Sequence, residues 1–291
     1  MNAHTPTSNP HPHVLDLQHL PPLSTIAQQL LREIAREDVD IPKLAALIEQ
    51  DPALTARLVG VANSAYFGAK DKVYTVADAI IRVLGLKLVR SLAIGLALST
   101  PFDTHGCRAF QLDRYWYCSM QTAALAGHLG TGIGGEPAER DLLFLAGLLH
   151  NLGQLALVHV FPAEMGRILE ALRDSPMPGI EAMERSVLGL DEHQAGVAIG
   201  HKWHLPYVIL RIIEHQAEPD YQGDHWREAR LVGFCRTLAN RCYDAPETLR
   251  DGPPEPVPAS LALPPAAVET VLNELAARDE EMRALAHTLS L

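Results

Sequence analysis

The sequence lacks several features that would narrow its function at once. It has no block of five or six basic residues, and 24 Lys and Arg against 35 Asp and Glu give a formal net charge of −11. Binding to a phosphate backbone needs clustered positive charge, so we expect no nucleic-acid partner. We also expect no membrane insertion, because no apolar run reaches the roughly 18 residues of a span. The N-terminal MNAHTPTSNPHPH has neither the basic start nor the apolar stretch of a signal peptide, which predicts a cytoplasmic protein.

Cysteine and strand patterns are equally sparse. The four cysteines form no C-x-x-C pair, which disfavours a zinc site or a redox motif and favours reduced thiols that serve as small core residues. No alternating apolar and polar run rich in β-branched residues occurs, so we expect no sheet. Since 47% of the 291 residues are hydrophobic, the chain can bury a substantial core. The sequence therefore predicts an all-helical globular protein.

Helix signals follow one another from Pro21 onward. Ser24, Asp40, Asp51 and Thr75 can each cap a helix, which we expect at about 24–37 for the first and 52–63 for the third. The fifth helix follows Gly85. Later helices are expected near 112–129, 138–160, 163–173, 180–188, 191–202, 206–217 and 225–243. A last apolar stripe, from about 265 to 289, either docks on its own domain or pairs with a partner helix.

Polar residues interrupt one of the most apolar stretches, LLHNLGQL at 148–155. On a continuous helix 138–160, Gly147, His150, Asn151 and Gln154 would share one narrow face. Leaving such groups buried and unpaired costs on the order of 1–3 kcal/mol each. The face is therefore either a polar network that fixes helix packing or part of a site that holds a ligand or a metal.

Five segments resemble a known family, the bacterial HDOD domain, a non-enzymatic relative of the HD phosphohydrolases. The segments are DPALTARLVGVANSAYFG (51–68), AIIRVLGLKLVRSL (79–92), YWYCSM (115–120), LAGLLHNLGQL (145–155) and WHLP (203–206). The resemblance implies an HDOD domain over 14–245, with an N-terminal helical part (14–106) packed on a multi-helix HD-like core (107–245). Outside it we predict a disordered tail (1–13), a Pro-rich linker (246–263) and a C-terminal helix (264–291).

The resemblance also shows where this chain departs from the catalytic relatives, which hold one or two metal ions with a His, a His-Asp pair and a final Asp. Cys118 stands where the first His is expected. His150 keeps the His of the pair, but Asn151 replaces its Asp, and Gln154 replaces the Lys that commonly follows. Asn240 stands at the closing Asp.

The remaining departures lie further along the chain. Glu192 stands at another His position, with His193 one residue away, and Gln216 falls where a His pair is usual, with His215 one residue early. The metal site is therefore predicted to be degenerate, with no catalytic residue, no metal ligand and no cofactor. If the alignment with the catalytic relatives is shifted by one residue at His193 or His215, that histidine takes the place of a metal ligand.

The resemblance implies a non-catalytic module of bacterial signal transduction that acts by binding other signalling or regulatory proteins. The alternative is a residual metal-dependent phosphohydrolase acting on a nucleotide or cyclic nucleotide. A third hypothesis is a sensor that binds a small nucleotide without turnover. The partner, the oligomeric state and the role of the C-terminal helix stay open at this point.

Overall fold

The computed structural model describes residues 20–33, 40–133, 137–174, 179–246 and 256–291. These residues contain helices and turns and no strand, which confirms the all-helical prediction. The predicted disordered tail and residues 247–255 of the predicted linker lie outside the described residues. The first helical elements are α1 (Thr25–Glu33), α2 (Ile41–Ile48), α3 (Pro52–Ala62), η1 (Ala65–Phe67), α4 (Val76–Asp78), the π-helical turn η2 (Ala79–Leu84) and α5 (Leu86–Ser99). The later elements are α6 (Leu112–Leu129), α7 (Pro137–Leu149), α8 (Leu152–Val160), α9 (Pro162–Asp174), α10 (Ile180–Leu188), α11 (Glu192–Lys202), α12 (Tyr207–His215), α13 (Trp226–Asp244), η4 (Ala259–Leu261), α14 (Pro265–Ala276) and α15 (Asp279–Ser290).

Side chains at the helix starts explain why these boundaries follow the sequence closely. Asp51 accepts hydrogen bonds from the backbone N–H groups of Ala53 and Leu54, and proline occupies the first position of α3. Asp191 and Gln194 form a reciprocal capping box at the start of α11. Each cap satisfies backbone donors that have no partner inside the helix.

The single helix predicted over 138–160 is wrong. The chain turns at His150 and Asn151, so that α7 ends at Leu149 and α8 begins at Leu152. No glycine or proline marks this break; Asn151 has φ −107° and ψ 18°, outside the helical region. His150, Asn151 and Gln154 therefore lie at the junction of two helices and not along one face of one helix.

The expectation that no apolar run is long enough to span a membrane also needs correction. Leu142–Val160 is long and apolar enough by length and composition, although 78% of this window is buried inside the structure. The stretch includes the turn at His150 and Asn151 that separates α7 from α8. Burial of this kind is typical of a core helix, which passes the same test of length and composition.

The C-terminal segment docks on its own chain, but as two helices where one was predicted, since α14 ends at Ala276 and α15 begins at Asp279. In the predicted linker, Leu261 and Leu263 are buried, so this end of the linker belongs to the core. The helix α15 packs against α6, α3 and η1. Its apolar residues fill the space between the N-terminal helices and the rest of the protein.

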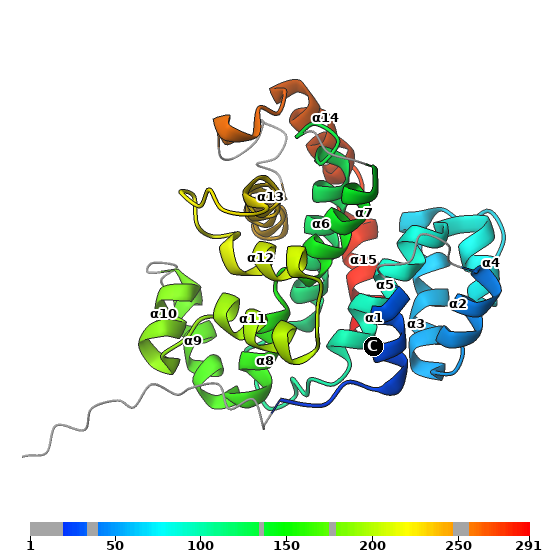
Figure 1. Cartoon of the computed structure of the whole chain (residues 1–291), viewed down its shortest axis with the longest axis horizontal. Helices are drawn as coiled ribbons and strands as arrows, with labels where there is room; N and C mark the ends of the chain where they lie inside the picture. The colour runs from blue at the N-terminus through cyan, green and yellow to red at the C-terminus, as the bar shows by residue number, and fades with distance from the viewer. Residues whose placement is uncertain (1–19, 34–39, 134–136, 175–178, 247–255) are drawn as a thin grey trace, which may run out of the picture.

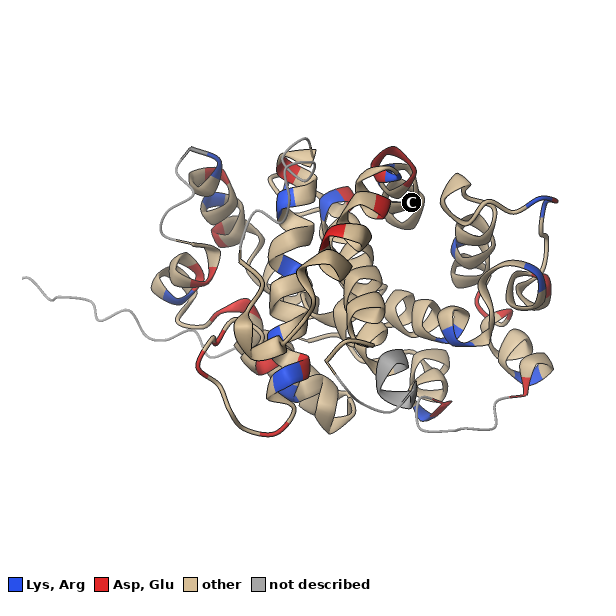
Figure 2. Ribbon diagram, turned by 90° about the horizontal axis from the view of Figure 1, so that it is seen from above, with Lys and Arg blue, Asp and Glu red and all other residues tan. Residues whose placement is uncertain are grey.

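The helices are arranged around α6 (Figure 1). This helix contacts α7, α13, α14 and α15, while α1–α5 lie on one side of the molecule and α8–α12 on the other. Most buried apolar residues, from Leu20 to Leu289, form one hydrophobic core, and Ala62, Val73 and Ala79 form a small separate cluster. The predicted N-terminal part and HD-like core therefore share that core, and the boundary between them stays a prediction. Charged positions of both signs are interspersed along the helices (Figure 2).

At Gly153 the backbone of α8 lies close against the backbone of α11. A Cβ atom on Gly153 would lie 1.8 Å from the carbonyl oxygen of Glu192 and 2.5 Å from the backbone nitrogen of Gly196. These neighbours are backbone atoms, which cannot rotate away as a side chain can. Gly153 therefore sets the distance at which α11, with Glu192 and His193 at its start, rests on α8.

Gly153→Ala should lower the free energy of unfolding by about 3 kcal/mol, because the new methyl group must push two helix backbones apart. Urea unfolding followed by circular dichroism measures this loss. Gly166→Ala in α9 is the matched control, since its Cβ would find only Cys107 Sγ, at 3.9 Å. The control should be at least as stable as the wild type, since alanine favours a helix more than glycine does. Equal stability of the two variants would contradict the proposed contact.

Candidate functional site

A cavity of about 620 Å³ opens between α6, α8, α9, α10, α11 and α13. It brings together residues that are far apart in the sequence. Six of the predicted site residues line it: Cys118, His150, Asn151, Gln154, Glu192 and Asn240. The rest of the lining includes the basic residues Arg114, Arg173 and Arg236, the acidic Asp244 and apolar side chains from α9 and α10. A volume of this size is typical of small-molecule sites.

The turn between α7 and α8 fixes the state of His150. Its Nδ1 lies 2.7 Å from the carbonyl oxygen of Gly147. Since a carbonyl can only accept, Nδ1 carries the proton and Nε2 keeps a lone pair. Burial, and then the positive charge of Arg236, lowers the pKa of His150 to about 3. The ring is therefore neutral at physiological pH and offers a hydrogen-bond acceptor or ligand atom, but no charge.

The side chains of Cys118 and Asn151 form hydrogen bonds with neighbouring side chains. The Ser119 hydroxyl donates to Asn151 Oδ1 at 3.0 Å, and the Cys118 thiol donates to Asn240 Oδ1 at 3.5 Å. Burial raises the pKa of Cys118 to about 12, so this sulfur remains a protonated thiol. A protonated thiol brings no negative charge to the cavity.

Glu192 is paired with an arginine that sequence reasoning did not single out. Arg236 Nη2 donates to Glu192 Oε1 at 2.6 Å and to Glu181 Oε1 at 2.8 Å. Burial alone would lower the pKa of Arg236, but the carboxylates of Glu192 and Glu181 offset this effect and raise it. The guanidinium is therefore a permanent cation between two carboxylates from different helices.

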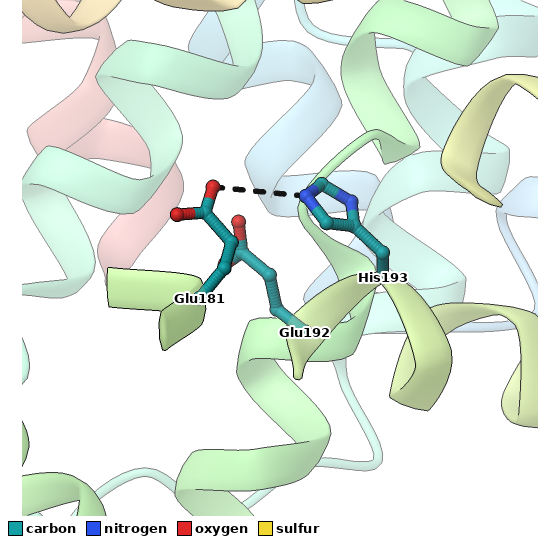
Figure 3. A group of neighbouring side chains, drawn as sticks. All are labelled: Glu181, Glu192 and His193. Atoms are coloured by element: carbon teal, nitrogen blue, oxygen red, sulfur yellow. Dashed lines mark ion pairs between the residues drawn. The ribbon is translucent and has the colours of Figure 1, made fainter. Parts of the chain in front are cut away.

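His193 lies beside Glu181 and Glu192, as Figure 3 shows. Its Nε2 lies 3.7 Å from Glu181 Oε1, which is longer than a hydrogen bond. The ligand atoms of Glu181, Glu192 and His193 all lie within 4.8 Å of one another, the one such group of His, Cys, Asp and Glu residues found among the described residues.

Gln216 and His215 are adjacent in sequence but have different surroundings. Gln216 Nε2 donates to the carbonyl oxygen of His150 at 2.7 Å, so it ties the end of α12 to the turn between α7 and α8. His215 stacks on Tyr221, with ring centroids 3.7 Å apart, and bonds to Arg211 and Glu218. Among the described residues, His215 does not belong to the group of Glu181, Glu192 and His193.

Sequence reasoning missed several charged residues of the site, among them Arg173 in the lining of the cavity. Arg114 and Asp244 form an ion pair at the mouth of the cavity, and Arg114 also donates to Asn240 Oδ1 at 3.3 Å. Arg236 could have been found from its spacing, because it precedes Asn240 by one helical turn and so shares its face. Glu181 carries no comparable signal, since the residues that it contacts are remote in the sequence.

Glu184 is a buried carboxyl that was also not predicted. It is fully buried, its Oε2 accepts from the backbone N–H of Glu192 at 2.9 Å, and its Oε1 has no hydrogen-bond partner. Burial, and then the negative charge of Glu192, raises the pKa of Glu184 well above 4.5. At neutral pH the side chain therefore holds a proton in the folded protein and loses it on unfolding.

This difference predicts a pH dependence of stability. Because the pKa is raised in the folded state, the contribution of Glu184 is fully present below about pH 4.5 and is lost as pH rises above that value. Glu184→Gln should therefore flatten the fall in unfolding free energy above pH 5, by up to about 1 kcal/mol per pH unit. Urea unfolding at pH 5, 6, 7 and 8 measures the slope. The exposed Glu170→Gln is the control, and equal slopes in the two variants would contradict the assignment.

Comparison with known proteins agrees with this architecture. The chain is 30% identical to a proposed signal transduction protein from Marinobacter aquaeolei VT8, with a TM-score of 0.78 over 94% of this chain and 60% of that one. It is 24% identical to an HDOD domain protein from Geobacter sulfurreducens, with a TM-score of 0.68 over 93% of each chain. A proposed phosphohydrolase from Shewanella amazonensis SB2B shares 23% identity and the fold, with a TM-score of 0.72 over 94% of this chain and 96% of that one.

A curated relative is an uncharacterized protein from Treponema pallidum (strain Nichols), 25% identical over 84% of this chain. The chain spans 46% of that protein and 60% of the Marinobacter protein, so both relatives are considerably longer. The family model of the HDOD domain matches residues 20–219, which is more than half of the chain. This chain therefore belongs to the HDOD domain family.

Proposed function

We propose that the protein is a non-catalytic module of bacterial signal transduction that acts in the cytoplasm by binding other signalling or regulatory proteins. Membership of the HDOD family and the likeness to a proposed signal transduction protein support this role. Nucleic acid and membrane insertion are not part of the proposal. The proposal names the class of the partner, a signalling or regulatory protein, and not an individual protein.

One observation carries the non-catalytic part of this proposal. Side chains at the positions that hold metal in catalytic relatives are bonded within the protein: Cys118 to Asn240, Asn151 to Ser119, and Glu192 to Arg236. Metal-assisted hydrolysis needs a divalent ion that lowers the pKa of a bound water. A neutral thiol, two amides and an arginine supply neither the ligands nor the charge for such an ion.

A residual metal-dependent phosphohydrolase is the second candidate. The grouping of Glu181, Glu192 and His193 favours it, as does the fold shared with a proposed phosphohydrolase. Against it, Arg236 already neutralises part of the charge of the two carboxylates. The Asn151 amide also brings no charge with which to offset a divalent ion.

The cavity supports one further element of the proposal, a small nucleotide that binds without turnover. Its volume, the lone pair on His150 Nε2 and the guanidinium of Arg173 suit a polar ligand of moderate size. Thermal unfolding with a panel of nucleotides tests this element, because a ligand that binds only the folded state raises the unfolding temperature. If no nucleotide raises the unfolding temperature at millimolar concentration, nucleotide binding is not part of the function.

The wild-type protein and its Asn151→Asp variant should both lack phosphohydrolase activity. Restoring one carboxylate leaves the Cys118 thiol, Asn240 and the Arg236 pairs unchanged, and the new side chain can still accept from Ser119. Elemental analysis after dialysis measures the metal content. Turnover of nucleotide and cyclic nucleotide phosphoesters with added Mn²⁺ measures the phosphohydrolase activity. Stoichiometric metal in the wild type, or metal-dependent turnover in either protein, would contradict a non-catalytic role.

Protein binding needs its own measurement. The full chain, used as bait in extracts of the native host, should capture a signalling or regulatory protein that then binds the purified chain in solution. Asn151→Asp should bind the same partner equally well, because the substitution changes a residue inside the cavity. Failure of every captured protein to bind the purified chain directly would contradict the proposed mode of action.

A further inference from the structure

The group of Glu181, Glu192 and His193 has the composition and spacing of a cation site. Two carboxylates from α10 and α11 and one imidazole from α11 place their ligand atoms within 4.8 Å of one another (Figure 3). Bonds from a metal ion to such atoms are about 2.0–2.2 Å long, so two ligands of one ion lie up to about 4.3 Å apart. Small side-chain movements would therefore bring all three within reach of a single ion.

The orientation of His193 is an independent sign of a ligand. Its Nδ1 lies 3.1 Å from the carbonyl oxygen of Ile213 and donates to it, which leaves a lone pair on Nε2. That Nε2 is buried, has no hydrogen-bond partner, and points toward Glu181. Metal-binding histidines are commonly held in this way, with one ring nitrogen donating to a backbone carbonyl and the other facing the ion.

The place that an ion would take is held by the side chain of Arg236. Its Nη2 lies 2.6 Å from Glu192 Oε1 and 2.8 Å from Glu181 Oε1. One guanidinium supplies a single positive charge for two carboxylates, and it gives nothing to the lone pair of His193. A divalent ion would match both the charge and the nitrogen ligand better than the guanidinium does.

We propose that Glu181, Glu192 and His193 form a divalent-cation site that Arg236 keeps closed. The guanidinium and the ion exclude each other, because both require the same carboxylate oxygens. Mixed nitrogen and oxygen ligands suit Zn²⁺ or Mn²⁺ better than Ca²⁺, which takes oxygen ligands alone. In the wild type the arginine holds the position, in agreement with the non-catalytic role proposed above.

Removal of the guanidinium should open the site. Arg236→Met in the full chain should bind one equivalent of Zn²⁺ at least tenfold more tightly than the wild type, measured by titration calorimetry with zinc chloride. Zinc should also raise the unfolding temperature of the variant more than that of the wild type. Adding His193→Ala to Arg236→Met should abolish the gain, because the nitrogen ligand is lost.

Arg114→Met is the matched control. Arg114 lines the same cavity and pairs with Asp244, but it does not contact the group of His193. This variant should bind zinc no better than the wild type. If Arg236→Met does not fold, because it leaves Glu192 buried without a cation, then Arg236→Gln provides the same test with an amide that can donate to one carboxylate.

The outcomes separate this inference from the proposed function. Stoichiometric metal in the wild type, as tightly bound as in Arg236→Met, would show that the arginine does not close the site and would also contradict the non-catalytic role. Zinc binding that is equally weak in the wild type, Arg236→Met and Arg236→Gln would overturn the cation site and leave the proposed function intact. A gain that survives His193→Ala would likewise overturn the assignment of the ligands.

Discussion

Compensation of charge at the start of α11 is the constraint on which the site depends. Glu192 is 4% exposed, and a carboxylate so far from water needs a cation close by. Arg236 from α13 supplies it and reaches Glu181 on α10 with the same nitrogen. Loss of one partner from a buried pair costs about 3–5 kcal/mol, so this arrangement holds three helices in a fixed relation. The chemistry of the cavity follows from where those helices meet.

Other features of the site adjust to this charge. The positive charge of Arg236 helps to keep His150 neutral, and the negative charge of Glu192 helps to keep Glu184 protonated. The contact at Gly153 holds the backbone of Glu192 against α8, so the carboxylate has little freedom to retreat toward solvent. The protonation states of His150 and Glu184 therefore depend on Arg236 and Glu192 as well as on burial.

Local signals made much of the fold predictable, and long-range contacts explain what sequence reasoning missed. The caps at Asp40 and Asp51 were predictable because each acts within three residues of itself. The turn at His150 was not, because its apolar surroundings favour a continuous helix and its carbonyl is satisfied by a side chain 66 residues away. The site residues shared by the family were found through the resemblance. The acidic partners of Arg236 were not predictable, because they lie 44 and 55 residues away in the sequence.

The helix α15 belongs to the packed core of this protein, although it lies beyond the stretch that the family model matches. Arg283 on this helix donates to the carbonyl oxygen of Tyr243 at the end of α13, and Met282, Leu285 and Leu289 are buried against the rest of the protein. The family match ends at residue 219, before α13 begins. A fragment cut at that limit would lose Arg236 together with the helices that cover α6. The stretch that the family model matches is therefore shorter than the stretch of this chain that contributes to its hydrophobic core.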